Sequence, residues 1–350
     1  MASFIFNSTP IQTSLQRIPA VLGLHEALAG RHLLLTGGTG FFGLWLLALL
    51  DQLNQQGAEL EVTVVSRNPV RFLDSQPHYR DRTWLRWLAD DVRDLRKIPG
   101  RPVDLILHAA GDTSAAAHTK SLEIFETILN GARRILDLAL YSNARRILLT
   151  GSGAQYGALP AGIAVTESYT GSCVSNSASS AYGEAKRAQE ALAAIYAQDH
   201  GLEAVMTRCF AFAGQGLPLD GHFAIGNFVR DALRADAIVL NSAGEAVRSY
   251  LHGADLAAWL LFILVKGKAG EAYNVGSDQA ISIADLAVRI GQRLAPHKTI
   301  QILGQPGAPS VRSWYVPDIG KARSLGLNVW TDLDTSIDSM ATWAKQTLTH

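Results

Sequence analysis

The 350-residue chain has few cysteines, no excess of either charge and no long apolar run. Its two cysteines, Cys173 and Cys209, cannot build a disulfide framework, which indicates reduced thiols in a cytoplasmic protein. Lysine plus arginine number 31, as do aspartate plus glutamate, so we expect neither nucleic acid nor an anionic membrane as a partner. Residues 1–17 do not resemble a secretory signal. The longest apolar runs, such as residues 257–265, reach about half of the ~20 residues that a membrane span needs and predict buried helix.

Glycine, by contrast, is present in a telling arrangement near the N-terminus. The apolar run His32-Leu33-Leu34-Leu35 leads into Thr36-Gly37-Gly38-Thr39-Gly40-Phe41-Phe42-Gly43, with glycines three residues apart. Such a turn reverses sharply, lets a pyrophosphate approach the backbone and packs the next helix closely, all of which favour residues without Cβ. The helix that follows would direct its free N–H groups at the phosphates. The loop therefore predicts a dinucleotide site that includes Gly37, Thr39, Gly40, Phe41, Phe42 and Gly43.

Apolar strand-like runs alternate with helical patterns after this loop, which predicts an α/β fold with a doubly wound parallel Rossmann sheet. Strands are expected at residues 32–36, 61–66, 83–89, 103–108, 146–150 and 203–208, and two clear helices at 121–140 and 182–198. The turn-rich segment 213–221 indicates departure into a smaller C-terminal substrate lobe. The expected division is an N-terminal extension (1–30), a Rossmann NAD(P)-binding domain (31–208 and 247–278) and a substrate-binding lobe (209–246 and 279–350).

The end of the second expected strand bears on the choice of cofactor. No acidic residue follows it, where NAD-binding folds commonly hold the ribose 2′-hydroxyl, and Ser66-Arg67 stands there instead. A hydroxyl and a guanidinium suit a 2′-phosphate, so NADP is preferred over NAD, although Arg67 could also begin a solvated loop.

Two further strand ends complete the expected cofactor site. Asp91 is positioned to accept from the adenine amino group, and Val92 to flank the ring. The run His108-Ala109-Ala110 lets the cofactor lie close to the backbone, with His108 interpreted as a core histidine rather than a catalyst.

The catalytic prediction rests on Tyr182 and Lys186, whose spacing of four puts both side chains on one helix face. A phenol titrates near pH 10, but a neighbouring ammonium stabilises its anion and makes it a proton acceptor closer to neutrality. Ser152, at the end of the preceding strand, could orient the reacting hydroxyl or carbonyl, or could simply cap a turn.

These motifs together resemble the extended short-chain dehydrogenases/reductases, and within them the NAD-dependent epimerase/dehydratase family acting on nucleotide sugars. The resemblance runs from about residue 31 to the C-terminus. Besides the motifs above it is carried by Asn130-Gly131, Tyr156-Gly157, the segment Arg248 to Asp255 and Tyr273-Asn274-Val275-Gly276. It implies that Tyr182 and Lys186 mediate hydride exchange at sugar C4, that Asn130 belongs to the cofactor site, and that Arg248 contacts the substrate diphosphate.

Departures from the family pattern narrow the chemistry. Dehydratases of this family carry Asp and Glu directly after the Ser or Thr, and the decarboxylases keep a Glu, whereas this chain has Gly153 and Ala154. Neither can move a proton. Ala211 stands where epimerases of the family often have a diphosphate-binding Asn. Candidate substrate ligands are therefore Arg248, Asn227 and Arg312.

The leading interpretation is an NAD(P)-dependent nucleotide-sugar epimerase with transient oxidation at C4. The alternative is an NADPH-dependent 4-keto-6-deoxy nucleotide-sugar reductase; a 4,6-dehydratase and a non-enzymatic dinucleotide sensor rank below both. The expected partners are a nucleotide-diphosphate sugar and a second copy of the chain, because helices 121–140 and 182–198 resemble the pair that forms a dimer interface in relatives. No metal site is expected. The resemblance also suggests a role in polysaccharide biosynthesis.

Overall fold

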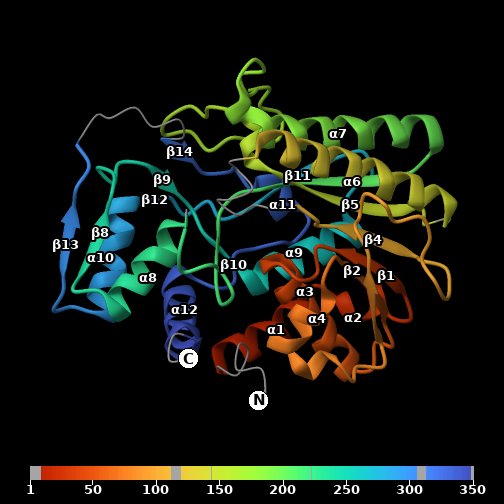
Figure 1. Ribbon diagram of the computed structural model, residues 1–350, viewed down its shortest axis with the longest axis horizontal. Coiled ribbons are helices and arrows are strands. Elements are labelled where there is room, and N and C mark those ends of the chain that lie inside the picture. Colours follow the sequence, from red (N-terminus) through yellow and green to blue (C-terminus); the bar gives the residue numbers. More distant parts are fainter. Residues whose placement is uncertain (1–8, 112–119, 143, 222, 306–312, 348–350) are drawn as a thin grey trace.

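The computed structural model describes residues 9–111, 120–142, 144–221, 223–305 and 313–347, and is built around a seven-stranded parallel sheet. The strand order is β11-β6-β5-β4-β1-β2-β3, so the chain winds outwards from β1 to β3 and then restarts at β4 on the other side of β1 (Figure 1). This confirms the doubly wound α/β fold. The strands are β1 (His32–Thr36), β2 (Glu61–Ser66), β3 (Leu85–Ala89), β4 (Leu105–His108), β5 (Arg146–Ser152), β6 (Glu203–Cys209) and β11 (Ala272–Val275).

The predicted strands agree with these bounds except at their ends. β3 and β4 each begin two residues later than predicted, and β5 continues two residues further, to Ser152. The seventh strand, β11, was not predicted as a strand, and its four residues pair with β6.

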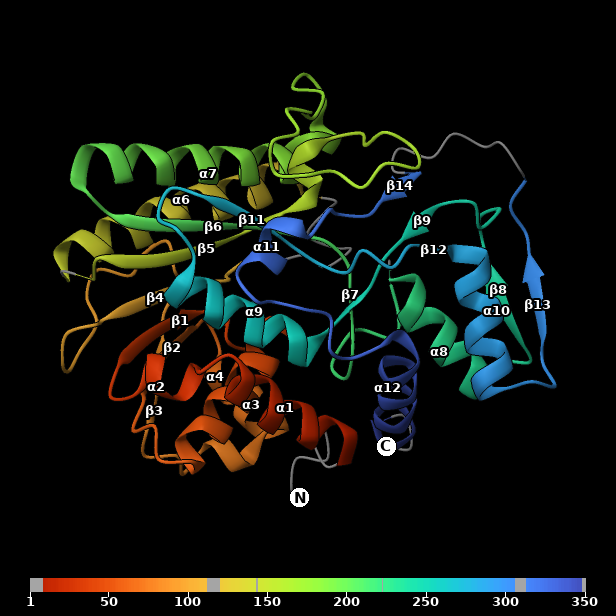
Figure 2. The same ribbon diagram turned by 180° about the vertical axis from the view of Figure 1, so that it is seen from behind.

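Two layers of helices cover the sheet because its strands are apolar on both faces. Leu33 and Leu35 of β1 point into the core under α3 (Phe41–Gln55) and α9 (Gly253–Lys266), whereas Leu34 points into the core under α6 (Ser121–Tyr141) and α7 (Ala181–His200). Figure 2 shows the two layers on opposite sides of the sheet. The sheet edge at which β1 and β4 end thus lies between them.

From residue 9 on, the predicted extension contains two helices that were not predicted, α1 (Thr9–Val21) and α2 (Leu24–Leu28). Ile11, Leu15 and Ile18 of α1 are buried in the core beneath α3 and α9. Burial on this scale makes the segment an integral part of that layer.

A separate core lies among three C-terminal helices, α8 (Ala224–Arg234), α10 (Ile283–Leu294) and α12 (Leu333–Thr347). Short sheets flank it, formed by β7 with β10, β9 with β12 and β14, and β8 with β13. The division of the chain into domains stays a prediction. The remaining elements are α4 (Pro69–Ser75), β7 (Phe212–Ala213), β8 (Ala237–Leu240), β9 (Val247–Arg248), β10 (Leu251–His252), β12 (Ile281–Ser282), β13 (Thr299–Ile302), β14 (Trp314–Tyr315) and α11 (Gly320–Ser324), with 3-10 turns η2 (Pro77–Tyr79), η3 (Gly153–Tyr156) and η4 (Ala178–Ser180).

The apolar run at residues 257–265 lies within α9, which is buried against α1, α3 and the sheet, as predicted. Among the residues that the structure describes, none of the helices combines the length and the hydropathy of a membrane span.

Candidate active site

The glycine loop joins β1 to α3 at the carboxyl edge of the sheet. Gly37 has φ +73°, and a Cβ there would lie 2.4 Å from the carbonyl oxygen of Ala109, so only glycine fits. A Cβ at Gly43 would lie 2.2 Å from the carbonyl carbon of Gly38, which shows how closely α3 approaches the loop. Gly40 precedes the first turn of α3, and a Cβ there would lie 3.6 Å from the carbonyl oxygen of Gly37, an ordinary contact distance. The three glycines therefore do different work.

The other residues predicted for the dinucleotide loop are the polar Thr39 and the apolar Phe41 and Phe42. The Thr39 hydroxyl lies 3.4 Å from the Ser66 hydroxyl at the end of β2. Phe41 and Phe42 are half-buried, and the Phe42 ring packs edge-on against Phe212 at 5.1 Å. Their side chains thus pack against the protein, which leaves their backbone N–H groups, in the first turn of α3, as the part that could meet a phosphate.

Arg67 is exposed just after β2, and its charge is one of several that lower the pKa of Asp91. The largest cause of that lowered pKa is Arg93, whose Nε and Nη2 donate to the two Asp91 oxygens at 2.9 Å each. Asp91 Oδ1 also accepts from the Arg93 backbone N–H, so Oδ2 is the oxygen that retains a lone pair. The adenine contact assigned to Asp91 stays a prediction, and it would share the carboxylate with Arg93.

The end of β4 lies beneath α6. A Cβ at Gly131 would lie 3.1 Å from Val92 and 3.9 Å from the His108 ring, so this glycine lets α6 approach both. Val92 is buried, whereas Asn130 is exposed one residue before Gly131. The place of Asn130 in the cofactor site stays a prediction.

His108 is 1% exposed, and its Nδ1 lies 2.8 Å from the hydroxyl of Thr36. The same hydroxyl accepts from the N–H of Ala110. Burial, followed by the nearby charge of Lys186, lowers the pKa of His108 to about 3, so the ring is neutral. Its contacts are those of a core residue that fixes the end of β4.

Lys186 is the most constrained of the predicted catalytic residues. Its side chain is buried, and its Nζ donates to the carbonyl oxygen of Thr150 at 2.6 Å and to Oε1 of Gln189 at 3.3 Å. Burial lowers the pKa of this ammonium to about 8. Two of its three N–H groups have acceptors, which leaves one for a ligand. A Cβ at exposed Gly111, next after Ala110, would lie 3.9 Å from Nζ, so the ammonium faces that strand end.

Tyr182 and Ser152 approach the same region from α7 and β5. Tyr182 lies one turn before Lys186, is partly exposed and packs beside Ile124 and Ile128 of α6. Ser152 is buried and caps the 3-10 turn η3, its Oγ accepting from the N–H of Ala154 at 3.1 Å. Ser152 thus caps a turn, but the cap uses only an acceptor site, so the hydroxyl hydrogen stays available to a ligand, and the catalytic role of Ser152 stays a prediction.

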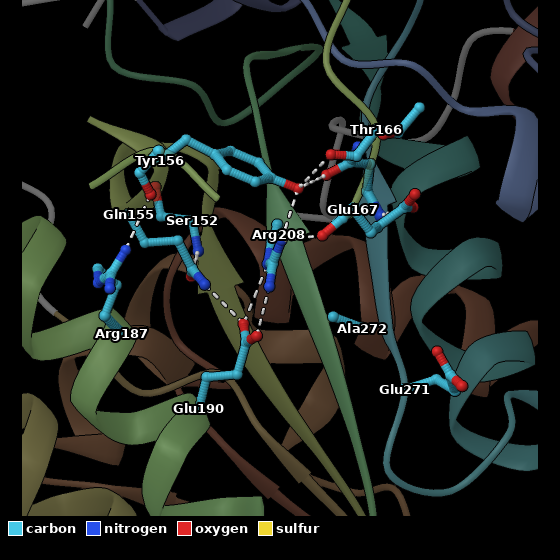
Figure 3. A network of polar contacts seen from close by, with 12 residues as sticks. Ser152, Gln155, Tyr156, Thr166, Glu167, Arg187, Glu190, Arg208, Glu271 and Ala272 are labelled. Carbon is cyan, nitrogen blue, oxygen red and sulfur yellow. Dashed lines mark hydrogen bonds and ion pairs between the residues drawn. The ribbon is translucent and has the colours of Figure 1, made fainter. Parts of the chain in front are cut away.

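A polar network lies behind Ser152 (Figure 3). Arg208 of β6 donates two hydrogen bonds to Glu190 of α7, at 3.1 and 2.5 Å, and a third to Tyr156. Gln155 bridges the Ser152 backbone N–H and the Glu190 carboxylate. Burial raises the pKa of Tyr156 to about 12, so its hydroxyl stays protonated and donates to Asn274. The network joins β5, β6, β11 and α7.

Four residues of the site were not among those predicted, namely Gln155, Gln189, Glu190 and Arg208. One signal could have found Glu190, because it follows Lys186 by four residues and so continues the face of Tyr182 and Lys186.

The predicted substrate ligands follow Tyr182 by more than 40 residues in the sequence and belong to the C-terminal elements. Arg248 of β9 pairs with Tyr315 of β14, and its guanidinium lies 5.8 Å from that ring. Asn227 of α8 donates to the carbonyl oxygen of Gly221 and accepts from Arg230. Arg312 lies outside the described residues. Where the structure describes the chain, it contains no cluster of His, Cys, Asp or Glu suited to a metal ion.

The sheet order, the glycine turn after β1 and the helix bearing Tyr182 and Lys186 define a doubly wound α/β protein of the dehydrogenase/reductase type. The chain belongs to the NAD dependent epimerase/dehydratase family, whose model matches residues 33–276. The family resemblance seen in the sequence is thereby confirmed.

Curated relatives cover most of the chain. UDP-glucuronic acid decarboxylase 6 of Arabidopsis thaliana is 28% identical over 295 residues, which span 84% of this chain and 82% of the relative. A dTDP-glucose 4,6-dehydratase of Streptomyces niveus is 25% identical, spanning 74% of this chain and 76% of that protein.

Solved structures share the fold. UDP-glucose 4-epimerase of Thermotoga maritima, with UDP-glucose, superposes with a TM-score of 0.75 at 20% identity, covering 91% of this chain and 99% of that one. A dTDP-glucose 4,6-dehydratase of Streptomyces venezuelae, with NAD and TYD bound, has a TM-score of 0.76 at 24% identity and covers 90% and 97%.

The glycine loop generates a paired prediction. Gly37→Ala should lower the free energy of unfolding by about 2 kcal/mol or more, because it strains a positive φ and forces Cβ against Ala109. Gly40→Ala, with φ −90° and no contact closer than 3.6 Å, should leave stability within about 0.5 kcal/mol but weaken NAD(P) binding. Urea denaturation and cofactor titration measure the two effects. Equal stability losses in both variants would contradict this account.

Proposed function

We propose that the protein is an NAD(P)-dependent nucleotide-sugar epimerase that acts through transient oxidation at sugar C4. The observation that carries the proposal is the buried Lys186 ammonium, held at the end of β5 one helical turn from Tyr182. Ser152 ends the same strand. The named relatives, two of which act on UDP-glucuronic acid and dTDP-glucose, support a nucleotide sugar as the substrate.

In this proposal Tyr182 takes the proton of the C4 hydroxyl, and Ser152 donates a hydrogen bond that orients the same oxygen. Lys186 stabilises the tyrosinate and holds the cofactor ribose with its remaining N–H. The chemistry supplied by a bound NAD(P) is reversible acceptance of hydride from the sugar carbon. The close approach of Gly37 to Ala109 and the open N-terminus of α3 fit the binding of its pyrophosphate.

The surroundings of Gly153 argue against dehydratase chemistry. A Cβ there would lie 2.8 Å from the hydroxyl of Tyr315 and 2.9 Å from the ring of Phe210. An acidic side chain at this position would therefore need both rings to move. With Ala154 beside it, the turn offers no carboxyl group to carry a proton between sugar carbons.

A second candidate is an NADPH-dependent reductase of 4-keto-6-deoxy nucleotide sugars. The observation that favours it is the end of β2, where Ser66 and exposed Arg67 suit a 2′-phosphate and no acid stands in the way. Both candidates use Tyr182, Ser152 and Lys186 alike, and they differ in whether reduced cofactor is consumed.

An assay of the purified protein separates the two. Incubation with UDP- and dTDP-hexoses and catalytic NAD(P) should give the C4 epimer with no net change in NAD(P)H absorbance. Tyr182→Phe should lower kcat about a hundredfold or more, because the proton acceptor is lost while the ring packing is kept. Stoichiometric NADPH consumption with a 4-keto sugar nucleotide would establish the reductase instead. No turnover of any such compound would reject both.

The cofactor preference makes a separate prediction. Arg67→Ala should weaken NADPH binding by about 1.5–3 kcal/mol, the worth of a hydrogen bond to a charged group, and leave NADH binding nearly unchanged. Arg71→Ala, exposed one turn further along, is the matched control. Fluorescence titration of each variant measures both affinities. Equal losses for NADPH and NADH would overturn the NADP assignment.

A homodimer through α6 and α7 is part of the proposal. The two helices pack side by side on one outer face of the molecule (Figure 1), and they leave Leu122, Tyr141 and Ile195 at least half exposed. Exposed apolar groups on neighbouring helices favour burial by a second copy. Light scattering should give twice the monomer mass, and Ile195→Glu should shift it towards monomer. A monomeric wild type would contradict this.

A further inference from the structure

We propose that Gln155 is a positioning residue, which locks the Ser152 turn to the face of α7 that carries Tyr182 and Lys186; this rests on the proposed function. The Gln155 side chain is 4% exposed. Its Oε1 accepts from the Ser152 N–H at 3.3 Å, and its Nε2 donates to Glu190 Oε2 at 2.6 Å (Figure 3). One carboxamide thus connects the serine turn to the helix.

The turn is built to hold this glutamine. Ser152 and Gln155 form a capping box, in which the serine oxygen accepts from the turn and the glutamine oxygen accepts from the Ser152 N–H. A Cβ at Gly151 would lie 2.8 Å from Gln155 Oε1, so the glycine makes room for the side chain to fold back. The direction of the Ser152 hydroxyl is consequently set by the turn that Gln155 closes.

We call the contact between Gln155 and Glu190 the clamp, and its Glu190 end is also held by hydrogen bonds. Glu190 lies one turn after Lys186 and two turns after Tyr182, so all three share a helix face. The Arg208 Nε and Nη2 groups hold its two oxygens, and Oε2 accepts from both Arg208 and Gln155. Any rotation of α7 therefore pulls on the Ser152 turn. The clamp keeps the proton acceptor and the hydroxyl donor in register.

Replacing the Gln155 carboxamide by a carboxylate of the same shape turns an attractive contact with Glu190 into a repulsive one. Gln155→Glu puts a carboxylate against Glu190, and the two repel unless they share a proton. At a pH below the raised pKa of the pair, one proton stays between the two carboxyl groups. The protonated Glu at position 155 then donates a hydrogen bond to Glu190, as the Gln155 amide does in the wild type. Charged and titratable groups around the pair are Arg208 of β6, Arg187 of α7, Tyr156 of the turn, and Glu167.

The chain offers a matched control. Gln55 of α3 donates to Asp51 at 2.9 Å, and Arg82 pairs with the same carboxylate, which reproduces the glutamine, carboxylate and arginine arrangement away from the glycine loop. Gln55 is exposed, so Gln55→Glu places a second carboxylate beside Asp51 where water screens the repulsion, at the C-terminal end of a helix that carries none of the proposed catalytic groups.

The experiment compares kcat, KM and thermal unfolding of both variants with wild type from about pH 6 to about pH 9. Gln155→Glu should lose stability relative to wild type as the pH rises, because the buried pair releases its shared proton, whereas the exposed Gln55→Glu should change stability little across the range. Only Gln155→Glu should lose kcat, by about tenfold at the alkaline end with recovery towards wild type at the acid end, and KM should change little. Gln155→Leu should be slow at every pH.

An unchanged kcat ratio for Gln155→Glu across the range, or an equal loss at every pH, would overturn the inference. A similar alkaline kcat loss in Gln55→Glu would overturn it too, because an added carboxylate far from Ser152 would then have the same effect. Ser152→Ala in the same assay tests the proposed function separately. If this variant turns over like wild type while Gln155→Glu behaves as expected, the role given to Ser152 fails and the clamp on α7 stands.

Discussion

The arrangement of the site depends on one buried charge. Lys186 carries an ammonium out of water into the layer between α7 and β5, and such a group needs acceptors in place before it can be accommodated. The carbonyl of Thr150 and the carboxamide of Gln189 supply them. Gln189 is on α7 with Lys186, and both donate to the Thr150 carbonyl of β5, so these two contacts tie the helix to the strand one turn after Tyr182.

A second constraint acts at the neighbouring strands. Gly37 lies so close to Ala109 that a side chain at position 37 would clash with the end of β4, which constrains how the glycine loop packs against that strand. The carboxyl ends of β1, β4 and β5 therefore present the open N-terminus of α3, a run of small residues and the Lys186 ammonium along one edge of the sheet. This is where doubly wound sheets bind their ligands, at the point where the strand order reverses.

Much of this was predictable because the signals are local. Glycines three apart and a tyrosine four residues before a lysine are patterns of neighbouring residues, and alternating apolar runs located six of the seven strands. The clamp was not predictable in the same way, since Gln155 and Glu190 are 35 residues apart. The helical extension was missed because α1 gains its stability from α3 and α9 rather than from its own sequence.

Departures from the family pattern decide the proposed chemistry as much as agreements do. Gly153 is surrounded by Tyr315 and Phe210, and Arg67 stands where an acid would select NAD. The central claim is nevertheless geometric, namely that one sugar oxygen meets both Ser152 and Tyr182.

The most direct test is a crystal structure of the Tyr182→Phe protein with NAD(P) and an unreacted nucleotide sugar. The account predicts that the C4 oxygen of the sugar accepts a hydrogen bond from the Ser152 hydroxyl, and that the edge of the substituted phenyl ring faces the same oxygen. A sugar whose C4 oxygen lies beyond the reach of either side chain would contradict it.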